Sequence, residues 1–260
     1  MTVRRLAVVL GLCLSFPLTA AEQPPIAVAA SLRIAMPSLV DAFEDATGRQ
    51  VRISYAASGV LTRQIQRGAP FELFLAANAA YPDKLIRAGL TDGAGTVYAY
   101  GRIGLFAPPD SPIDVSEGLA GLRERLADGS IERFAIPNPE HAPYGIRARQ
   151  ALRQAGLWTA IQPVIVVAEN AAQAAQFAAS GSTAGGIVPA SLGLAPRFAQ
   201  HGRFALIPPD RHEPLEQRMV LLKGAGATAR ALHDFLLTSE ARAILREHGF
   251  SVPATGEEQQ

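Results

Sequence analysis

The pattern that most constrains the fold is an alternation of short apolar runs with amphipathic segments, which begins at residue 26 and continues along most of the chain. Residues 26–30 form an apolar run that predicts a buried strand. Met36, Leu39 and Phe43 then recur at helical spacing until Gly48, which predicts a helix with a glycine at its end. Strands that alternate with helices are typical of α/β folds with largely parallel sheets.

The rest of the chain repeats this pattern. Further strands are predicted at 51–55, 71–76, 104–107, 134–136, 164–167, 186–188 and 219–222. Further helices are predicted at 61–68, 81–88, 119–126, 145–155, 171–179, 228–237 and 239–247. The strands gather in an N-terminal and a central group, so we expect two α/β lobes, each a mostly parallel sheet flanked by helices. With 260 residues, 48% of them hydrophobic, the chain is long enough for two cores.

The N-terminus has the pattern of a secretory signal peptide. Arg4 and Arg5 precede an uncharged apolar run at 6–18, which ends in small residues and predicts cleavage near Ala20 or Ala21. The run is shorter than the roughly 20 residues that span a bilayer. We therefore expect a signal peptide at 1–21, a first lobe from 22–104 and 216–260, and a second lobe from 105–215.

Removal of the signal peptide changes the charge and the cysteine content of the chain. The formal charge goes from +1 to −1, so no surplus of positive charge indicates nucleic-acid binding. Cys13, the only cysteine, lies in the apolar run after Leu12, which disfavours a lipid-anchored cysteine and leaves the mature chain without a thiol. No two of the five histidines have the spacing of a zinc protease motif, and no nucleophile elbow or Walker loop follows a strand. The sequence therefore offers no positive case for an enzyme.

Four segments share a layout that suits an anion, in which a strand ends and small or hydroxylated residues begin a helix. They are residues 29–32, 56–60, 141–145 and 169–171. Each places unpaired backbone N–H groups at the carboxyl edge of a sheet, where the helix dipole also favours negative charge. A serine at such a position is most often an N-cap, but four such helix starts around one cleft would form a cage of uncharged donors.

These segments carry a resemblance to a known family. Residues 29–32, 55–65, 68–74, 138–145 and 169–177, together with the C-terminal helices up to Phe250, closely resemble the periplasmic molybdate-binding proteins of ABC importers. The resemblance covers essentially the whole mature chain. It implies a two-lobed periplasmic binding fold of type II, with two hinge crossings and a tetrahedral oxyanion in the cleft between the lobes.

The resemblance also implies which residues bind the oxyanion. Ser31 and Ser58 resemble the two hydroxyl ligands of the first lobe, while Ala171 in the second lobe would donate a backbone N–H. Tyr144 would donate through its backbone N–H or its phenol. Three neighbouring residues complete the expected set as accessory donors: Leu32, Gly59 and Asn170.

One position departs from the family pattern. Many members carry a tyrosine ligand after the strand at 186–188, but this chain has Pro189, which has neither an N–H nor a hydroxyl. Tyr144 is our candidate replacement, and the alternative is that it serves only as a packed aromatic at the hinge.

The chemistry of the ligand follows from the same resemblance. Molybdate and tungstate are fully deprotonated at neutral pH and only accept hydrogen bonds, so a site made of donors suits both and does not separate them. We expect Glu140 and Glu169 to point away from this site, since a carboxylate beside a dianion would be unfavourable. Sulfate is the alternative ligand, which only the size of the cavity would discriminate. The expected protein is a monomeric periplasmic carrier without a cofactor, which delivers the oxyanion to the permease and ATPase subunits of an ABC importer.

Overall fold

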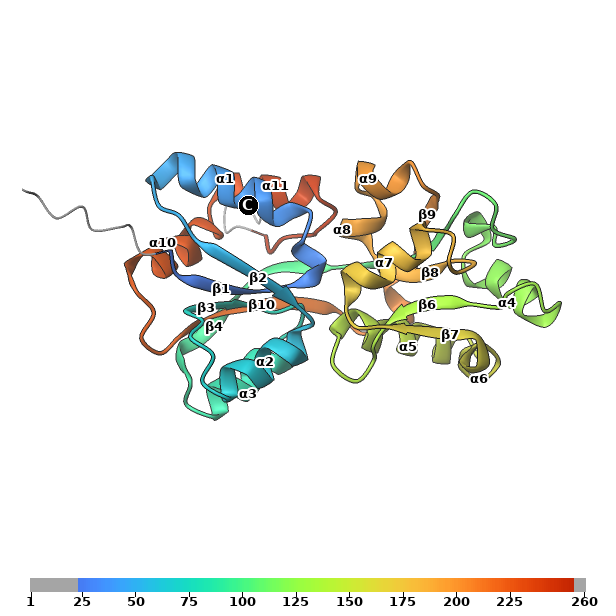
Figure 1. The fold of residues 1–260 in the computed structure, drawn as a ribbon, viewed down its shortest axis with the longest axis horizontal. Helices are drawn as coiled ribbons and strands as arrows, with labels where there is room; N and C mark the ends of the chain where they lie inside the picture. The colour runs from blue at the N-terminus through green and yellow to red at the C-terminus, as the bar shows by residue number, and fades with distance from the viewer. Residues whose placement is uncertain (1–22, 255–260) are drawn as a thin grey trace, which may run out of the picture.

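Two five-stranded sheets, each covered by helices on both faces, form two lobes that lie side by side (Figure 1). This computed structural model describes residues 23–254, so the predicted signal peptide, its cleavage site and Cys13 lie outside the described residues. No helix within 23–254 has the length and apolar character needed to cross a membrane.

Lobe 1 is built on the sheet with strand order β2-β1-β3-β10-β4. Its strands are β1 (Pro25–Ala29), β2 (Arg52–Ala56), β3 (Leu73–Leu75), β4 (Thr91–Gly101) and β10 (Leu215–Leu222). Its helices are α1 (Ala35–Thr47), α2 (Ser58–Gln66), α3 (Ala80–Arg87), α10 (Ala227–Phe235) and α11 (Ser239–Glu247), with the short 3-10 helix η1 (Ala30–Leu32).

Lobe 2 is built on the sheet with strand order β7-β6-β8-β5-β9. Its strands are β5 (Ile103–Ala107), β6 (Phe134–Pro137), β7 (Ile165–Ala168), β8 (Gly186–Pro189) and β9 (Arg203–Leu206). Its helices are α4 (Leu119–Ala127), α5 (Pro143–Gln154), α6 (Trp158–Ile161), α7 (Ala171–Ala179), α8 (Ala190–Gly193) and α9 (Pro196–Ala199). Three 3-10 helices complete the lobe: η2 (Val115–Glu117), η3 (Gln162–Val164) and η4 (Pro209–Arg211).

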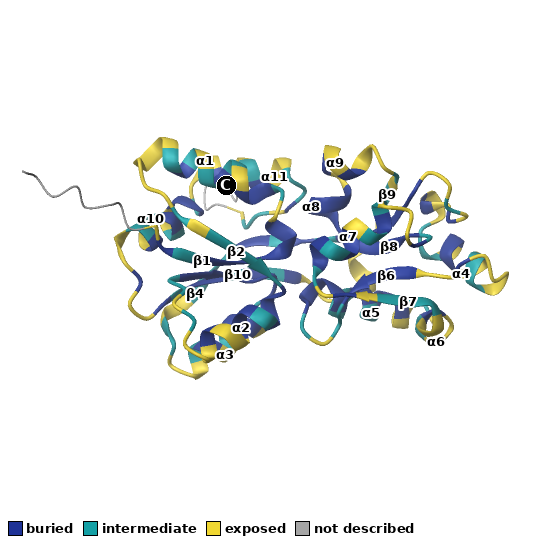
Figure 2. Ribbon diagram, viewed as in Figure 1, coloured by how far each residue is buried: buried dark blue, intermediate teal, exposed yellow. Residues whose placement is uncertain are grey.

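The central strands of both sheets, such as β1 and β6, are largely buried (Figure 2), and alternating side chains of each sheet enter two different cores. In β1, Ile26 and Val28 pack with α1, α10 and α11, whereas Ala27 packs on the opposite face with α2 and α3. In β5, Leu105 and Phe106 likewise belong to separate clusters on the two faces of the second sheet. Successive side chains of a strand point to opposite faces of the sheet. Because helices cover both faces, these strands are apolar throughout.

The sheets differ in one respect from the expected mostly parallel arrangement. Strand β1 pairs in parallel with β2 and β3, but β10 is antiparallel to both β3 and β4. In the second sheet, β6 is parallel to β7 and β8, while β5 is antiparallel to β8 and β9. The chain enters lobe 2 through β5 and returns to lobe 1 through β10. They begin at the boundary where their neighbours end, so each sheet is mixed.

The chain crosses between the described lobes twice, once at Arg102 and once in the segment 207–214 between β9 and β10. The expected boundary between 104 and 105 falls inside β5, slightly beyond the first crossing. Strand β4, with three glycines in its sequence, was not expected from the sequence and forms here because β10 supplies its hydrogen-bonding partner.

Candidate functional site

A small cavity lies between the two lobes, where strands of both sheets end. Its lining consists only of uncharged residues: Ala29, Ala30, Ser31, Ala57, Ser58, Ala77, Ala142, Pro143, Tyr144 and Ala171. The volume of the cavity is about 10 Å³. This volume lies below the roughly 300–1,000 Å³ of pockets that hold drug-sized molecules, so the cavity suits a small ion or molecule.

The four principal residues expected from the sequence meet in this cavity. Ser31 lies in η1 and Ser58 is the first residue of α2, both in lobe 1. Tyr144 lies in the first turn of α5 and Ala171 is the first residue of α7, both in lobe 2. Residues that are up to 140 positions apart in the chain therefore face one space, because strand ends of both sheets point to the same boundary.

The three accessory residues lie outside the lining. Leu32 is fully buried in the apolar core of lobe 1, and the N–H of Gly59 donates to the carbonyl of His141 at 2.9 Å. Asn170 is the N-cap of α7, where its Oδ1 accepts from the N–H groups of Ala172 and Gln173 at 3.0 and 3.1 Å. In this structure the Gly59 N–H and the Asn170 Oδ1 are thus already engaged within the protein.

The three hydroxyl groups of the lining are buried and have their protons available. Ser58 Oγ accepts from the N–H of Ala77 at 3.0 Å, and Tyr144 Oη accepts from Gln217 Nε2 at 2.8 Å. Ser31 Oγ is buried and makes no hydrogen bond within residues 23–254. A hydroxyl that accepts from an N–H still carries its own proton, so the cavity offers O–H donors to whatever fills it.

Helix starts add backbone donors to these hydroxyls. Ser58 and Ala171 are the first residues of their helices, and Pro143 opens α5 directly before Tyr144. The first N–H groups of a helix have no acceptor within the helix and lie at the positive end of its dipole. Three helices of at least nine residues therefore direct partial positive charge toward the cavity.

Burial keeps the Tyr144 phenol neutral. It raises the pKa of Tyr144 well above its ordinary value of 10.0, and the nearby Ser31 hydroxyl and the Gln217 amide offset only part of the rise. The raised pKa keeps the phenol protonated across the neutral range, as a hydrogen-bond donor must be.

The two neighbouring carboxylates point away from the cavity, as expected. Glu140 pairs with Arg149 at 2.8 Å and its side chain is 75% exposed. The Glu169 side chain is 61% exposed and lies 3.8 Å from His141 Nε2. Neither side chain places negative charge in the lining. Within residues 23–254, no cluster of three or more His, Cys, Asp or Glu side chains could bind a metal cation.

Direct hydrogen bonds between the lobes flank the cavity. The Gly59 N–H of lobe 1 donates to the His141 carbonyl of lobe 2, and Ser191 Oγ of lobe 2 donates to the Ser31 carbonyl at 2.9 Å. A Cβ added at Gly59 would lie 2.8 Å from both Cβ and O of His141. The lobes are thus closed around the cavity, and a glycine permits the close approach.

Sequence reasoning missed the residues behind Tyr144. Gln217 in β10 and Tyr98 in β4 are buried and connected to the phenol by hydrogen bonds. The strand was expected only from 219, but extending its alternation backwards would have placed Gln217 on the same buried face as Leu215 and Met219. Pro189, expected from the sequence to be a lost ligand position, ends β8 and is not part of the cavity lining.

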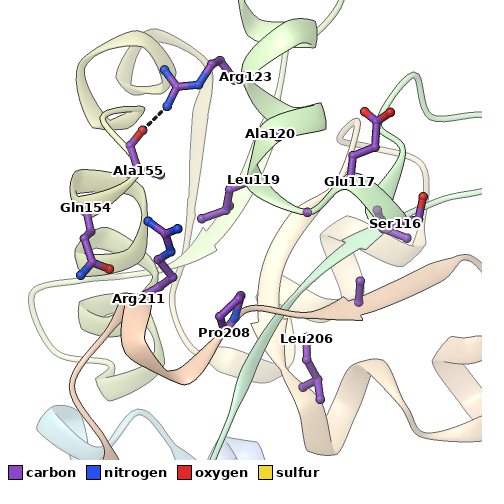
Figure 3. A pocket seen from close by; sticks show the side chains of 13 residues that line it. Ser116, Glu117, Leu119, Ala120, Arg123, Gln154, Ala155, Leu206, Pro208 and Arg211 are labelled. Atoms are coloured by element: carbon purple, nitrogen blue, oxygen red, sulfur yellow. Dashed lines mark hydrogen bonds between the residues drawn. The ribbon is translucent and has the colours of Figure 1, made fainter.

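A much larger hollow lies entirely on lobe 2 (Figure 3). Its volume is about 570 Å³, and it lies beside η2 and α4, where Arg123 donates to the Ala155 carbonyl and Arg211 lies near Gln154. It contains none of the residues that the sequence singled out. The small cavity between the lobes remains the candidate site despite its size.

Comparisons with known proteins agree with this architecture. Residues 25–251 match the family model described as bacterial extracellular solute-binding protein. The chain is 34% identical over 248 residues to the molybdate-binding protein ModA of Rhodobacter capsulatus, covering 94% of this chain and 93% of that protein.

Solved structures give the same result for the fold. The periplasmic molybdate-binding protein of Azotobacter vinelandii superposes with a TM-score of 0.81 at 27% identity, covering 89% of this chain and all of that one. The sulfate-binding protein SubI of Mycobacterium tuberculosis superposes with a TM-score of 0.72 at 15% identity, covering 91% and 89% of the two chains, which supports the fold alone. The fold is therefore the two-lobed type II fold of periplasmic binding proteins.

Proposed function

The chain belongs to the family of bacterial extracellular solute-binding proteins, and from this premise we propose that it captures molybdate, and tungstate as well, for an ABC importer. The observation that carries the proposal is the closed cavity between the lobes, whose lining is entirely uncharged and rich in hydrogen-bond donors. A fully deprotonated oxyanion accepts hydrogen bonds from every side and needs no acceptor in return.

In this proposal Ser31, Ser58 and Tyr144 donate their O–H protons to the oxyanion, and Ala171 donates its backbone N–H. Tyr144 takes the place of the tyrosine that Pro189 replaces. Uncharged donors that are already oriented stabilise an anion strongly in a site from which water is excluded, because the low local dielectric strengthens each hydrogen bond. Hydrogenphosphate carries a proton that needs an acceptor, which this lining does not favour.

The biological setting follows from the N-terminal pattern and the family. We infer that the chain is exported to the periplasm, that cleavage occurs near Ala20 or Ala21, and that the mature protein acts as a monomer. It would bind and release its ligand without chemical conversion and deliver it to membrane permease and ATPase subunits. The relative from Rhodobacter capsulatus, named as a molybdate-binding protein, supports the choice of ligand.

Titration calorimetry of the mature protein with molybdate, tungstate, sulfate and phosphate tests the proposal. We expect tight binding of molybdate and tungstate, with sulfate and phosphate weaker by at least a hundredfold. Sulfate has the charge and shape of molybdate but is smaller, so it tests whether the closed cavity selects by size. Tight binding of sulfate, or no heat with molybdate, would overturn the assignment.

A further inference from the structure

Behind the candidate site, a buried chain of polar side chains connects Tyr144 to the hinge. Tyr98 Oη donates to Gln217 Oε1 at 2.9 Å, and Gln217 Nε2 donates to Tyr144 Oη at 2.8 Å. The three residues are 1%, 0% and 2% exposed. A buried polar network stabilises a protein only when its donors and acceptors form hydrogen bonds with one another. The ordered hydrogen bonds of this network therefore indicate that these side chains have a specific function.

The direction of each hydrogen bond determines what Tyr144 can offer to a ligand. An amide oxygen only accepts and an amide nitrogen only donates. Because Tyr98 donates to the oxygen of Gln217, the nitrogen faces Tyr144 and occupies a lone pair of the phenol oxygen. The phenol proton then remains for the cavity. The opposite orientation of the amide would accept that proton and turn a phenol lone pair toward the ligand.

Local backbone structure places Tyr98 at this position. Gln217 pairs with Ala99, but the next residue, Arg218, pairs with Val97, so Tyr98 is the extra residue of a β-bulge. Bulges redirect side chains, and this one brings the Tyr98 hydroxyl, whose single proton goes to Gln217 Oε1, within 3.3 Å of the carbonyl of Ala76.

A hinge glycine provides the space for the junction. A Cβ added at Gly101, the last residue of β4, would collide with the Tyr144 hydroxyl and lie 2.6 Å from Gln217 Nε2. Gly101 directly precedes the crossing at Arg102. The contact between Gln217 of lobe 1 and Tyr144 of lobe 2 therefore forms where the two lobes join.

We propose that Gln217 and Tyr98 are positioning residues that hold the Tyr144 hydroxyl as a donor toward the bound oxyanion. The inference rests on the proposed function and deepens it, because it assigns donor selectivity to residues that do not touch the ligand. Burial raises the pKa of Tyr98 as well as that of Tyr144, so both phenols keep the protons that this arrangement requires.

A double-mutant cycle with molybdate as the probe tests this role. Gln217→Met removes the amide at similar length, and we expect molybdate affinity to fall about fivefold or more, within the range of coupling between residues in contact. In the Tyr144→Phe background the same substitution should change affinity less than twofold, since no phenol remains to be oriented. Tyr98→Phe should weaken binding in the same pattern, and it carries the test if Gln217→Met does not fold.

The matched control is Tyr100→Phe, which removes a phenol hydroxyl from the same strand outside the network and should leave affinity unchanged. Equal losses from Gln217→Met in both backgrounds would indicate a merely structural role and overturn the inference alone. Wild-type affinity in Gln217→Met and Tyr98→Phe, or in Tyr144→Phe, would also overturn it. Failure of the wild-type protein to bind molybdate would overturn this inference together with the proposed function.

Discussion

The three hydroxyl groups of the cavity are held by the protein in different ways. Ser58 and Tyr144 each accept a hydrogen bond that orients their proton, whereas Ser31 Oγ is buried without a partner among the described residues. A buried polar group without a hydrogen bond is unfavourable by about 1–3 kcal/mol. A ligand that accepts a hydrogen bond from Ser31 would remove this penalty. Ligand binding should therefore stabilise the closed state.

This difference predicts distinct effects for the two serines. Ser31→Ala should weaken molybdate binding without lowering the melting temperature of the ligand-free protein, because it removes no hydrogen bond of the protein. Ser58→Ala should reduce both, since it leaves the N–H of Ala77 without its acceptor. Together they should weaken binding at least tenfold, because each hydrogen bond to a charged group contributes about 1.5–3 kcal/mol.

Calorimetry and thermal unfolding of each serine variant provide the measurement. Ser38→Ala, at a half-buried position of α1 outside the cavity lining, is the matched control, and it should change neither affinity nor melting temperature. An unchanged affinity in the double variant would show that the two serines do not bind the ligand.

At the scale of elements, the N-terminus of α2 and the loop before α5 form one of the two hydrogen-bonded contacts that join the closed lobes. The Gly59 N–H reaches the His141 carbonyl only because no Cβ stands between them. The same glycine belongs to the helix start that contributes Ser58. A residue that contacts the other lobe and a residue of the candidate site thus lie next to each other in the first turn of α2.

Gly59→Ala should therefore keep the lobes apart. We expect molybdate affinity to fall at least tenfold, because the added Cβ would lie 2.8 Å from two atoms of His141 when the lobes close. Small-angle scattering should show a smaller ligand-induced compaction than in the wild type. In the control Gly226→Ala, on the other side of lobe 1, the nearest atom is Glu72 Oε2 at 3.3 Å, and affinity should be retained. Wild-type compaction in Gly59→Ala would contradict this view of closure.

At the scale of the molecule, two lobes with separate cores are joined by two crossings and share one cavity. A ligand that contacts both lobes binds the folded, closed protein and not the unfolded chain. Its binding therefore adds to the free energy of unfolding by mass action.

Molybdate at about 1,000 times its Kd should stabilise the protein by about 4 kcal/mol, which corresponds to a rise in Tm of about 8–16 °C for a chain of this size. Scanning calorimetry with and without molybdate measures the rise. Sulfate at the same concentration serves as the control and should raise Tm much less. An equal rise with sulfate would contradict selection by the closed cavity.

Local sequence predicted the four segments that meet in the candidate site, and the family resemblance singled out one residue in each of them. Ser31, Ser58, Tyr144 and Ala171 each lie where an apolar strand ends and a helix begins, a pattern readable over a few residues. Because helices packed on such sheets start at the carboxyl edge, this pattern also predicts that these positions face the cleft. The α/β class and the two lobes followed from the same alternation.

Only the tertiary structure decided what surrounds these residues. Tyr98 and Gln217 are separated by 119 positions, and Gln217 and Tyr144 by 73, so no local pattern joins them. The Gly-rich strand β4 forms because β10 pairs with it, and the same pairing produces the bulge at Tyr98. Strand alternation and helix starts are local properties of the chain. The direction of the Tyr144 phenol proton and the close approach at Gly59 depend on contacts that exist only once the lobes are assembled.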